Sequence, residues 1–277
     1  MNIAVFCVTY NSNCELDNYL RSLINSSIKV ADRITLDIMV ADNALVYNPI
    51  TLSETEVLSH INLSYYHFPH NPGYFGAVRE LMSKTDISKY DYIIISNVDV
   101  TVDNGFFNTL LSKKYDEKTG WIATSILSQT EGRDRNPAVL KRYSKAKLRF
   151  LSLKHRIPLL NVLYNKTLYK RKKYKSQYSA MPIYAGHGSF ILLSHNYFSH
   201  CGIIDYPMFL FCEELYLAEM CHKSGLTVYY DPSMIVYDKE HISIGKMKRG
   251  LSYRKSLFYK SNYQSLKYII ETFYKNQ

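Results

Sequence analysis

Strand-like and helix-like segments alternate along the first 130 residues, and this alternation constrains the fold more than any other feature of the chain. Strand-like apolar runs occupy residues 2–10, 35–44, 61–68, 91–96 and 120–127, and helix-like segments occupy 14–27, 71–84 and 104–115. Parallel strands need crossover connections, which are usually helices. The order therefore predicts an α/β fold with a mostly parallel central sheet and helices on both faces.

The later part of the chain returns to the same kind of pattern. Residues 188–194 read as a strand, and a loop then leads into a helix that we expect to end near Gly225. Two more strand-like pieces follow at 226–232 and 234–243. At the first predicted helix, Asn13 is the expected N-cap.

Size and composition are typical of a globular protein with a sizeable core, at 277 residues with 47% hydrophobic content. No apolar run approaches the ~20 residues of a membrane-spanning helix, and the first residues do not resemble a signal peptide. The five cysteines are odd in number and form no CxxC pair. We therefore expect free thiols and a cytosolic chain.

The positive charge is concentrated in one segment. Residues 135–204 contain 14 Lys and Arg but no Asp or Glu, which leaves 20 basic and 24 acidic residues in the rest of the chain. Within it, residues 137–180 read as one or two amphipathic helices broken at Pro158, and residues 246–277 as a basic, aromatic helical tail. A localised basic stripe indicates an anionic partner: nucleic acid, an acidic membrane surface or a phosphorylated ligand.

Polar residues follow three of the predicted strands, at 9–11, 42–43 and 97–99. Ligands of open α/β sheets bind outside the carboxyl ends of the strands, so these positions predict a binding site. The chain has no GxGxxG after its first strand and no Walker-type glycine loop, which disfavours a dinucleotide site and a P-loop. A carboxylate at a strand end, such as Asp99, can instead hold a hard cation such as Mg²⁺.

A second acidic cluster, Glu213 and Glu214, stands where an aromatic loop turns into a predicted helix. A helix N-terminus stabilises ionised carboxylates by about 0.3–1 kcal/mol. That suits a general base, which must be unprotonated to act.

Seven motifs in order resemble family 2 glycosyltransferases of the GT-A fold, and most closely the bacterial rhamnosyltransferase-like group that builds surface polysaccharides. They are VTYNS, VADNA, NPGYFGA, SNVDV, GSFILLS, GIIDYPMFLFCEEL and GLTVYYDPSMIVYDKEHIS. The resemblance covers about residues 2–128 and 186–243. It implies one catalytic domain over 1–245, with a nucleotide-sugar-binding half at 1–130, a basic insertion at 135–180 and an acceptor half at 181–245; the tail at 246–277 lies outside it.

The resemblance also implies which residues bind the donor. They are Thr9, Tyr10 and Asn11 for the base pocket, Asp42 for the base edge, Asn71 and Gly73 for close backbone approach to the ribose or diphosphate, and Asn97 with Asp99 for the short acidic motif.

Catalytic and metal roles follow from the same resemblance. Glu214 would deprotonate an acceptor hydroxyl for attack at the anomeric carbon, with inversion, and Glu213 is the alternative base. Asp99 would bind Mg²⁺ or Mn²⁺. The family's late histidine falls on Asp238 here, and His241 lies three residues further on, so either could complete the metal site.

The functional expectation is an inverting transferase that uses a nucleotide-diphospho-sugar. The first choice of donor is dTDP-rhamnose, and the alternative is a hexosyl or N-acetylhexosaminyl transferase using a UDP-sugar. The acceptor would be a lipid-linked saccharide in O-antigen or capsule synthesis, with the basic segment in peripheral contact with the inner face of the cytoplasmic membrane. His187 is a further candidate near the acceptor site. Readings from another class are a catalytically degenerate relative and a basic nucleic-acid- or membrane-binding protein.

Overall fold

The computed structural model describes residues 1–49, 58–157, 159–161, 178–239 and 251–275, with side chains from residue 255 onward in the last range. His241, one of the two alternatives for completing the metal site, lies outside the described residues. Within the described residues, no helix is both long enough and apolar enough to span a membrane. All five cysteines carry free thiols, as predicted.

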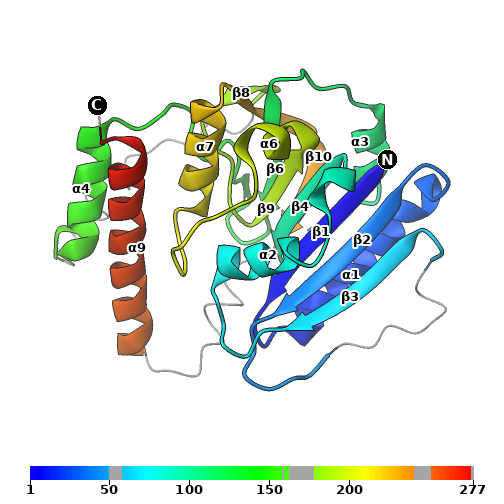
Figure 1. Cartoon of the computed structure of the whole chain (residues 1–277), viewed down its shortest axis with the longest axis horizontal. Helices are drawn as coiled ribbons and strands as arrows, with labels where there is room; N and C mark the ends of the chain where they lie inside the picture. Colours follow the sequence, from blue (N-terminus) through cyan, green and yellow to red (C-terminus); the bar gives the residue numbers. More distant parts are fainter. Residues whose placement is uncertain (50–57, 158, 162–177, 240–250, 276–277) are drawn as a thin grey trace.

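The described strands form one sheet in the order β3-β2-β1-β4-β9-β6-β10-β5, with β7 paired to β6 and β8 to β10 (Figure 1). Their bounds are β1 Asn2–Thr9, β2 Thr35–Asp42, β3 Ile61–His67, β4 Tyr92–Asn97, β5 Val100–Val102, β6 Thr119–Ser128, β7 Arg133–Asp134, β8 Met181–Ile183, β9 Phe190–Ser194 and β10 Thr227–Asp238.

The sheet is mixed but largely parallel, which confirms the predicted fold class. Strands β3, β2, β1 and β4 are parallel neighbours, and β6 is parallel to β10. Strand β9 runs antiparallel to both β4 and β6 and joins the two parallel parts. The two strand-like pieces predicted at 226–232 and 234–243 are one strand, β10, whose pairing with β6 shifts in register between Asp231 and Ile235.

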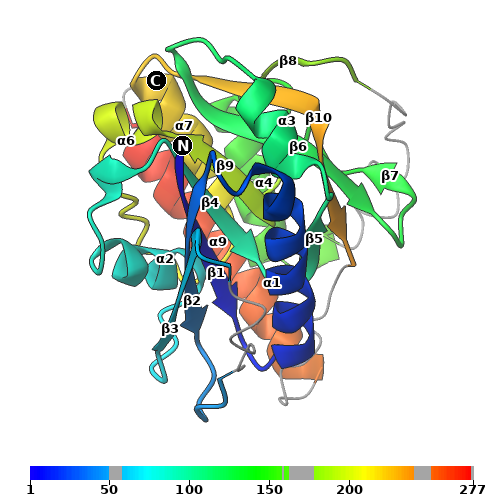
Figure 2. The same ribbon diagram turned by 90° about the vertical axis from the view of Figure 1, so that its right-hand side faces the viewer.

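Helices cover both faces of the sheet (Figure 2). Their bounds are α1 Asn13–Ser27, α2 Tyr74–Met82, α3 Phe106–Ser112, α4 Lys145–Arg156, α6 His195–Cys201, α7 Glu213–Lys223 and α9 Leu251–Phe273, with 3₁₀ turns at Ile28–Val30 and Ile87–Lys89. One buried cluster packs α1 and α3 on the sheet, and a second packs α2, α6 and α7 on the opposite face. The N-cap of α1 is Ser12 rather than Asn13, whose side-chain amide donates to the Asn48 carbonyl at 2.8 Å.

Helices α4 and α9, from the basic segment and the tail, lie side by side at one end of the molecule (Figure 1). They are joined to α7 through Glu219, which is 1% exposed. Its carboxylate accepts two hydrogen bonds from Arg142, at 3.0 and 2.7 Å, one from Tyr274 at 2.5 Å and one from Tyr184. The segment before α4, the end of α9 and the middle of α7 are therefore fastened at one buried carboxylate.

Candidate active site

A cavity of about 570 Å³ lies at the carboxyl ends of β1 and β4 and at the start of α7. This is the edge where ligands of open α/β sheets bind. Residues singled out from the sequence line much of it: Thr9, Tyr10, Asn71, Gly73, Asn97, Asp99, His187, Glu213, Glu214 and Asp238. Asp99 and the Glu213–Glu214 pair, more than a hundred positions apart in the sequence, thus face the same cavity.

Two residues at the β1 and β2 side of the cavity carry buried polar atoms that have no partner among the described residues. The side chains belong to Thr9 and Asn43, which are 2% and 3% exposed. The Asn43 backbone N–H donates to the Thr9 carbonyl at 2.9 Å, and its side-chain amide donates to the Gly73 carbonyl at 3.1 Å. Thr9 Oγ1 and Asn43 Oδ1 have no hydrogen-bond partner among the described residues. Because buried polar atoms are rarely left unpaired, they suit contacts to a bound polar molecule.

Asp42 and Asn11, predicted to contact the nucleotide base, do not line the cavity. The Asp42 carboxylate is buried and accepts hydrogen bonds from the Ala44 N–H at 2.9 Å and from the Tyr65 hydroxyl at 2.8 Å. Asn11 is exposed, at a positive φ of 52°. Asn43, the neighbour of Asp42, is the better placed of the two, because Asn43 lines the cavity.

The structure explains the glycine at position 73 by a contact within the protein, whereas the family resemblance implied close backbone approach to the ribose or diphosphate. Its φ is +86°, and a Cβ built on it would stand 2.1 Å from the Phe209 carbonyl oxygen. The Tyr74 N–H donates to that same carbonyl at 3.2 Å. The absence of a side chain therefore lets the aromatic loop before α7 approach the start of α2, which closes one wall of the cavity.

Asp99 and Asp238 form a carboxylate pair at the end of the sheet. The β10–β5 register places Asp238 opposite Val100, and the Lys239 N–H donates to the Asp99 carbonyl at 3.1 Å. Both carboxylates are buried. Burial raises the pKa of Asp99, the Asp238 carboxylate raises it further, and the Arg135 guanidinium opposes the rise.

This pair fits a divalent cation that is bound together with a substrate. Mg²⁺ is commonly held by one or two carboxylates plus phosphate oxygens of the ligand. Two adjacent buried carboxylates match that donor set. Within the residues that the structure describes, no three or more His, Cys, Asp or Glu side chains are grouped to hold an ion. A cation held by this pair would need ligand oxygens to complete its coordination.

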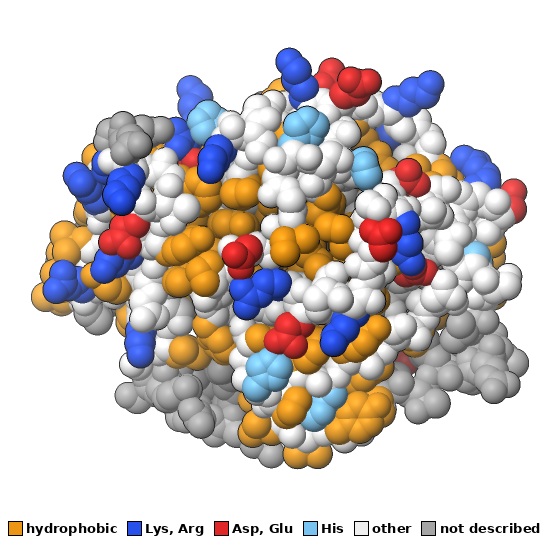
Figure 3. All heavy atoms as spheres, in the orientation of Figure 1, with side chains coloured by type: hydrophobic (Ala, Val, Ile, Leu, Met, Phe, Trp, Pro, Cys, Tyr) orange, Lys and Arg blue, Asp and Glu red, His pale blue; other side chains and the backbone are white. Residues whose placement is uncertain are grey.

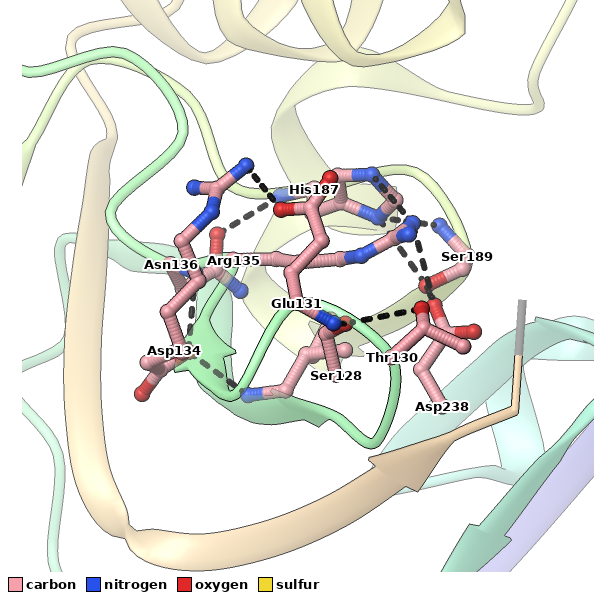
Figure 4. Close-up of polar contacts among 11 residues, drawn as sticks. Ser128, Thr130, Glu131, Asp134, Arg135, Asn136, His187, Ser189 and Asp238 are labelled. Carbon is pink, nitrogen blue, oxygen red and sulfur yellow. Dashed lines mark hydrogen bonds and ion pairs between the residues drawn. The ribbon is translucent and has the colours of Figure 1, made fainter. Parts of the chain in front are cut away.

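Arg135 was not identified from the sequence, yet its side chain lines the cavity beside this pair (Figure 4). Its guanidinium forms an ion pair with Asp238 at 3.2 Å and contacts His187 Nε2 at 3.4 Å. His187 Nδ1 lies 2.9 Å from Ser189 Oγ, which donates to Asp238 at 3.3 Å. The only feature of the sequence that pointed to Arg135 was the stretch without Asp or Glu that begins there. Such a stretch indicates a charged surface and does not predict a buried contact.

The two glutamates begin α7, as predicted, after two residues with strained backbone. Phe211 and Cys212 have φ of 73° and 64°. Burial, together with the charge of Glu214, raises the pKa of Glu213 to about 8. Burial also raises the pKa of Glu214. Desolvation therefore opposes the effect of the helix dipole, worth about 0.3–1 kcal/mol, at both carboxylates.

The loop before α7 contributes apolar side chains to the cavity wall, and α9 contributes a polar one. Phe209, Leu210 and Phe211 line it, together with Asn262 of α9. Phe209 is 36% exposed. A partly exposed aromatic beside a pair of carboxylates is a surface on which a sugar ring can stack while its hydroxyls reach the acids.

No family model matches this chain, and no curated protein matches it. Two solved structures are similar to it along nearly its whole length. The first is a crystal structure of GalNAc-T7 with UDP, GalNAc and Mn²⁺, at a TM-score of 0.63 and 13% identity, covering 99% of this chain and 49% of that one. The second is TarS of S. aureus, at a TM-score of 0.51 and 8% identity, covering 97% of this chain and 44% of that one.

The chain spans about half the length of these solved proteins. At such low identity the likeness concerns the backbone alone. The mixed, largely parallel sheet and the two structural matches show that this chain has the GT-A fold.

Proposed function

We propose that this protein is a glycosyltransferase that moves a sugar from a nucleotide-diphospho-sugar to a hydroxyl group of a saccharide. The observation that carries the proposal is the convergence of three chemistries in one cavity: unpaired buried polar atoms, the Asp99–Asp238 pair and the Glu213–Glu214 pair. These suit, respectively, a nucleotide, the region of a diphosphate, and an acceptor hydroxyl. The GT-A fold agrees with this assignment.

In the proposed reaction Glu214 takes the proton of the acceptor hydroxyl. The acceptor oxygen bonds to the anomeric carbon while the bond from that carbon to the diphosphate oxygen breaks, so the nucleoside diphosphate leaves and the anomeric configuration inverts. Glu214 is preferred to Glu213 because the charge of Glu214 helps to hold the proton on Glu213. A divalent cation held by Asp99 and Asp238 would neutralise charge on the leaving diphosphate.

The test of the base is Glu214→Gln, with Glu213→Gln as the matched variant one position away. Loss of a general base typically lowers the rate by about 10²–10⁴-fold. We expect that loss in kcat for Glu214→Gln, with donor affinity retained, and a smaller loss for Glu213→Gln. Wild-type turnover in Glu214→Gln would remove it as the base, and a full loss confined to Glu213→Gln would transfer the role to Glu213.

The donor is proposed as dTDP-rhamnose, with UDP-sugars as the alternative. The presence of UDP and GalNAc in the GalNAc-T7 structure is a reason to include UDP-GalNAc in the first screen. Thermal stabilisation by each nucleotide-sugar, with and without Mg²⁺ or Mn²⁺, identifies the donor, because a ligand at 100 times its Kd stabilises by roughly 2.7 kcal/mol. If no nucleotide-sugar stabilises the protein and none is turned over, the proposed activity is wrong, although the fold remains as described.

The acceptor is proposed as a lipid-linked saccharide of cell-surface polysaccharide synthesis, reached from an anionic membrane surface. Phe150, Leu153 and Ile157, on and just after α4, are 44%, 45% and 43% exposed. Exposed Arg149 and Arg156 flank them, and Figure 3 shows Lys and Arg side chains among hydrophobic ones at the α4 end of the molecule. An apolar stripe flanked by cations suits the interface of an anionic bilayer, where each Lys or Arg contributes about 1 kcal/mol.

Co-sedimentation with phosphatidylglycerol and phosphatidylcholine vesicles tests this contact. We expect salt-sensitive binding to the anionic vesicles and none to single-stranded oligonucleotides. Leu153→Ser should weaken it, whereas Ile28→Ser, at a site that is 54% exposed and far from α4 in the sequence, should not. Equal binding of both vesicle types, or preferential binding of oligonucleotides, would contradict the membrane contact.

A further inference from the structure

The loop that follows β7 is held firmly on both sides of Arg135. On one side, the Asp134 carboxylate accepts hydrogen bonds from the Ser125 hydroxyl at 2.6 Å and from the Tyr230 hydroxyl at 2.7 Å. It also accepts from the backbone N–H groups of Ile126 at 2.9 Å and Asn136 at 2.8 Å. The backbone just before and after Arg135 is thus tied to the sheet.

The other side is fixed by the Asn136 side chain, which is 3% exposed. Its amide donates to the Thr124 carbonyl at 2.8 Å, and its carbonyl accepts from the His187 N–H at 2.8 Å. The Arg135 N–H donates to the Ile126 carbonyl at 2.8 Å. A loop with this many anchors presents its side chain in a defined direction, which lowers the entropy lost when that side chain binds a ligand.

That direction is into the cavity. In Figure 4 the Arg135 side chain extends from the loop toward Ser189 and Asp238. It is 14% exposed, and its ion-pair partner Asp238 is 3% exposed. A guanidinium presents five N–H donors in a planar fork that matches carboxylate and phosphate oxygens. Arg135 lines the cavity, so its guanidinium brings a positive charge of this geometry to the cavity wall.

We propose that Arg135 binds the diphosphate of the donor, beside the Asp99–Asp238 pair. This rests on the proposed function, since it presupposes a nucleotide-diphospho-sugar in the cavity. The charge balance gives the reason. The two carboxylates and a divalent cation together sum to zero, so the cation alone would leave the site neutral. With the cation bound, Arg135 gives the Asp99–Asp238 end of the cavity a net positive charge, which favours a diphosphate there.

The experiment separates the diphosphate from the rest of the nucleotide. Calorimetry in the presence of Mn²⁺ measures the affinity of UDP, dTDP, uridine and thymidine for the wild type and for Arg135→Met, Arg135→Lys and Arg133→Met. Arg133 belongs to β7, just before this loop, and pairs with Glu131 but does not line the cavity, so it is the matched charge control. Melting curves establish that each variant is folded.

We expect Arg135→Met to weaken nucleoside diphosphate binding by about 10–100-fold, the range for a lost charge-assisted hydrogen bond. Nucleoside affinity should stay unchanged, Arg135→Lys should lose less because it keeps the charge without the fork, and Arg133→Met should match the wild type. Unchanged diphosphate affinity in both Arg135 variants would overturn this inference and leave the proposed function standing. A wild type that binds none of the nucleoside diphosphates would overturn both. If Arg135→Met does not fold, Arg135→Gln replaces it, and unchanged diphosphate affinity in that variant decides against the inference.

Discussion

Replacement of Glu213 by glutamine should stabilise the protein above neutral pH, and by an amount that grows with pH. The side chain is 6% exposed at the start of α7. Burial and the charge of Glu214 raise its pKa to about 8 from an ordinary value of 4.5. Between those two values the folded protein holds a proton that the unfolded chain has lost. The free energy of unfolding must therefore fall as pH rises through this interval, and level off above it.

The magnitude follows from the width of the interval. Each pKa unit is worth about 1.36 kcal/mol, so 3.5 units correspond to at most roughly 5 kcal/mol. Glutamine has nearly the same shape and no charge, so it removes this dependence. At about pH 5 the two proteins should have similar stability, and at about pH 9 the variant should be more stable by roughly 3–5 kcal/mol.

The assay is urea denaturation of wild type and Glu213→Gln at several pH values between these limits, read as the difference in free energy of unfolding. Titrating groups that do not interact with Glu213 cancel in that difference. Glu271→Gln is the control, since Glu271 is 64% exposed and an exposed substitution usually changes stability by less than about 0.5 kcal/mol. A difference between wild type and Glu213→Gln that stays constant with pH would refute the reasoning, because it would mean that Glu213 has the same affinity for protons in both states.

The same series in a Glu214→Gln background tests the two causes separately. Burial is the larger cause of the raised pKa of Glu213, and the charge of Glu214 is the second. Removing that charge should shift the pH dependence to lower pH without abolishing it. Complete loss of the dependence would assign the effect to the neighbouring charge instead of to burial.

Two further substitutions test the frame around the cavity. Gly73→Ala should destabilise the protein by about 2–5 kcal/mol in urea denaturation, because its Cβ would meet the Phe209 carbonyl at a backbone conformation that favours glycine. The control is Gly132→Ala, also at positive φ but in open space, which should cost only about 1–2 kcal/mol. Equal costs for the two variants would refute the steric argument. Glu219→Gln should lower the free energy of unfolding by about 3–5 kcal/mol, because it leaves the partly buried Arg142 guanidinium without its counterion. A loss below ~1 kcal/mol, the range of exposed ion pairs, would show that this buried contact stabilises no more than a surface one.

The sequence predicted the parallel part of the sheet because strand and helix patterns alternate there with short connections. It did not predict the direction of β9, since an apolar run of five residues reads the same in either direction. The short strands β5 and β8 were also missed, because three residues carry too little pattern. Local patterns specify which residues form an element, whereas strand direction is decided by which neighbours the strand meets in the folded chain.

In the candidate site, too, some features could be predicted from local sequence patterns and others depend on contacts in the folded chain. Positions at strand ends could be predicted, because the carboxyl edge of a parallel sheet is fixed by topology. A choice between adjacent residues could not be predicted, as Asp42 and Asn43 show: the Asp42 carboxylate accepts from Tyr65, and Asn43 lines the cavity. Arg135 was missed for a related reason, since its importance comes from a contact with Asp238, about a hundred residues later.

Helix α7 shows how the destabilising features of the candidate site are supported by the rest of the molecule. Its first turn carries two carboxylates with raised pKa values and follows two residues at positive φ, each of which lowers stability. Its middle carries Glu219, which is fastened by Arg142 and by Tyr274. These partners come from the basic segment and from the tail, the two regions that lie outside the family resemblance. The contacts of Glu219 hold α7 in place although its first turn carries buried carboxylates and follows strained backbone. We therefore expect the residues around Arg142 and Tyr274 to influence the position of the candidate base without touching the substrate.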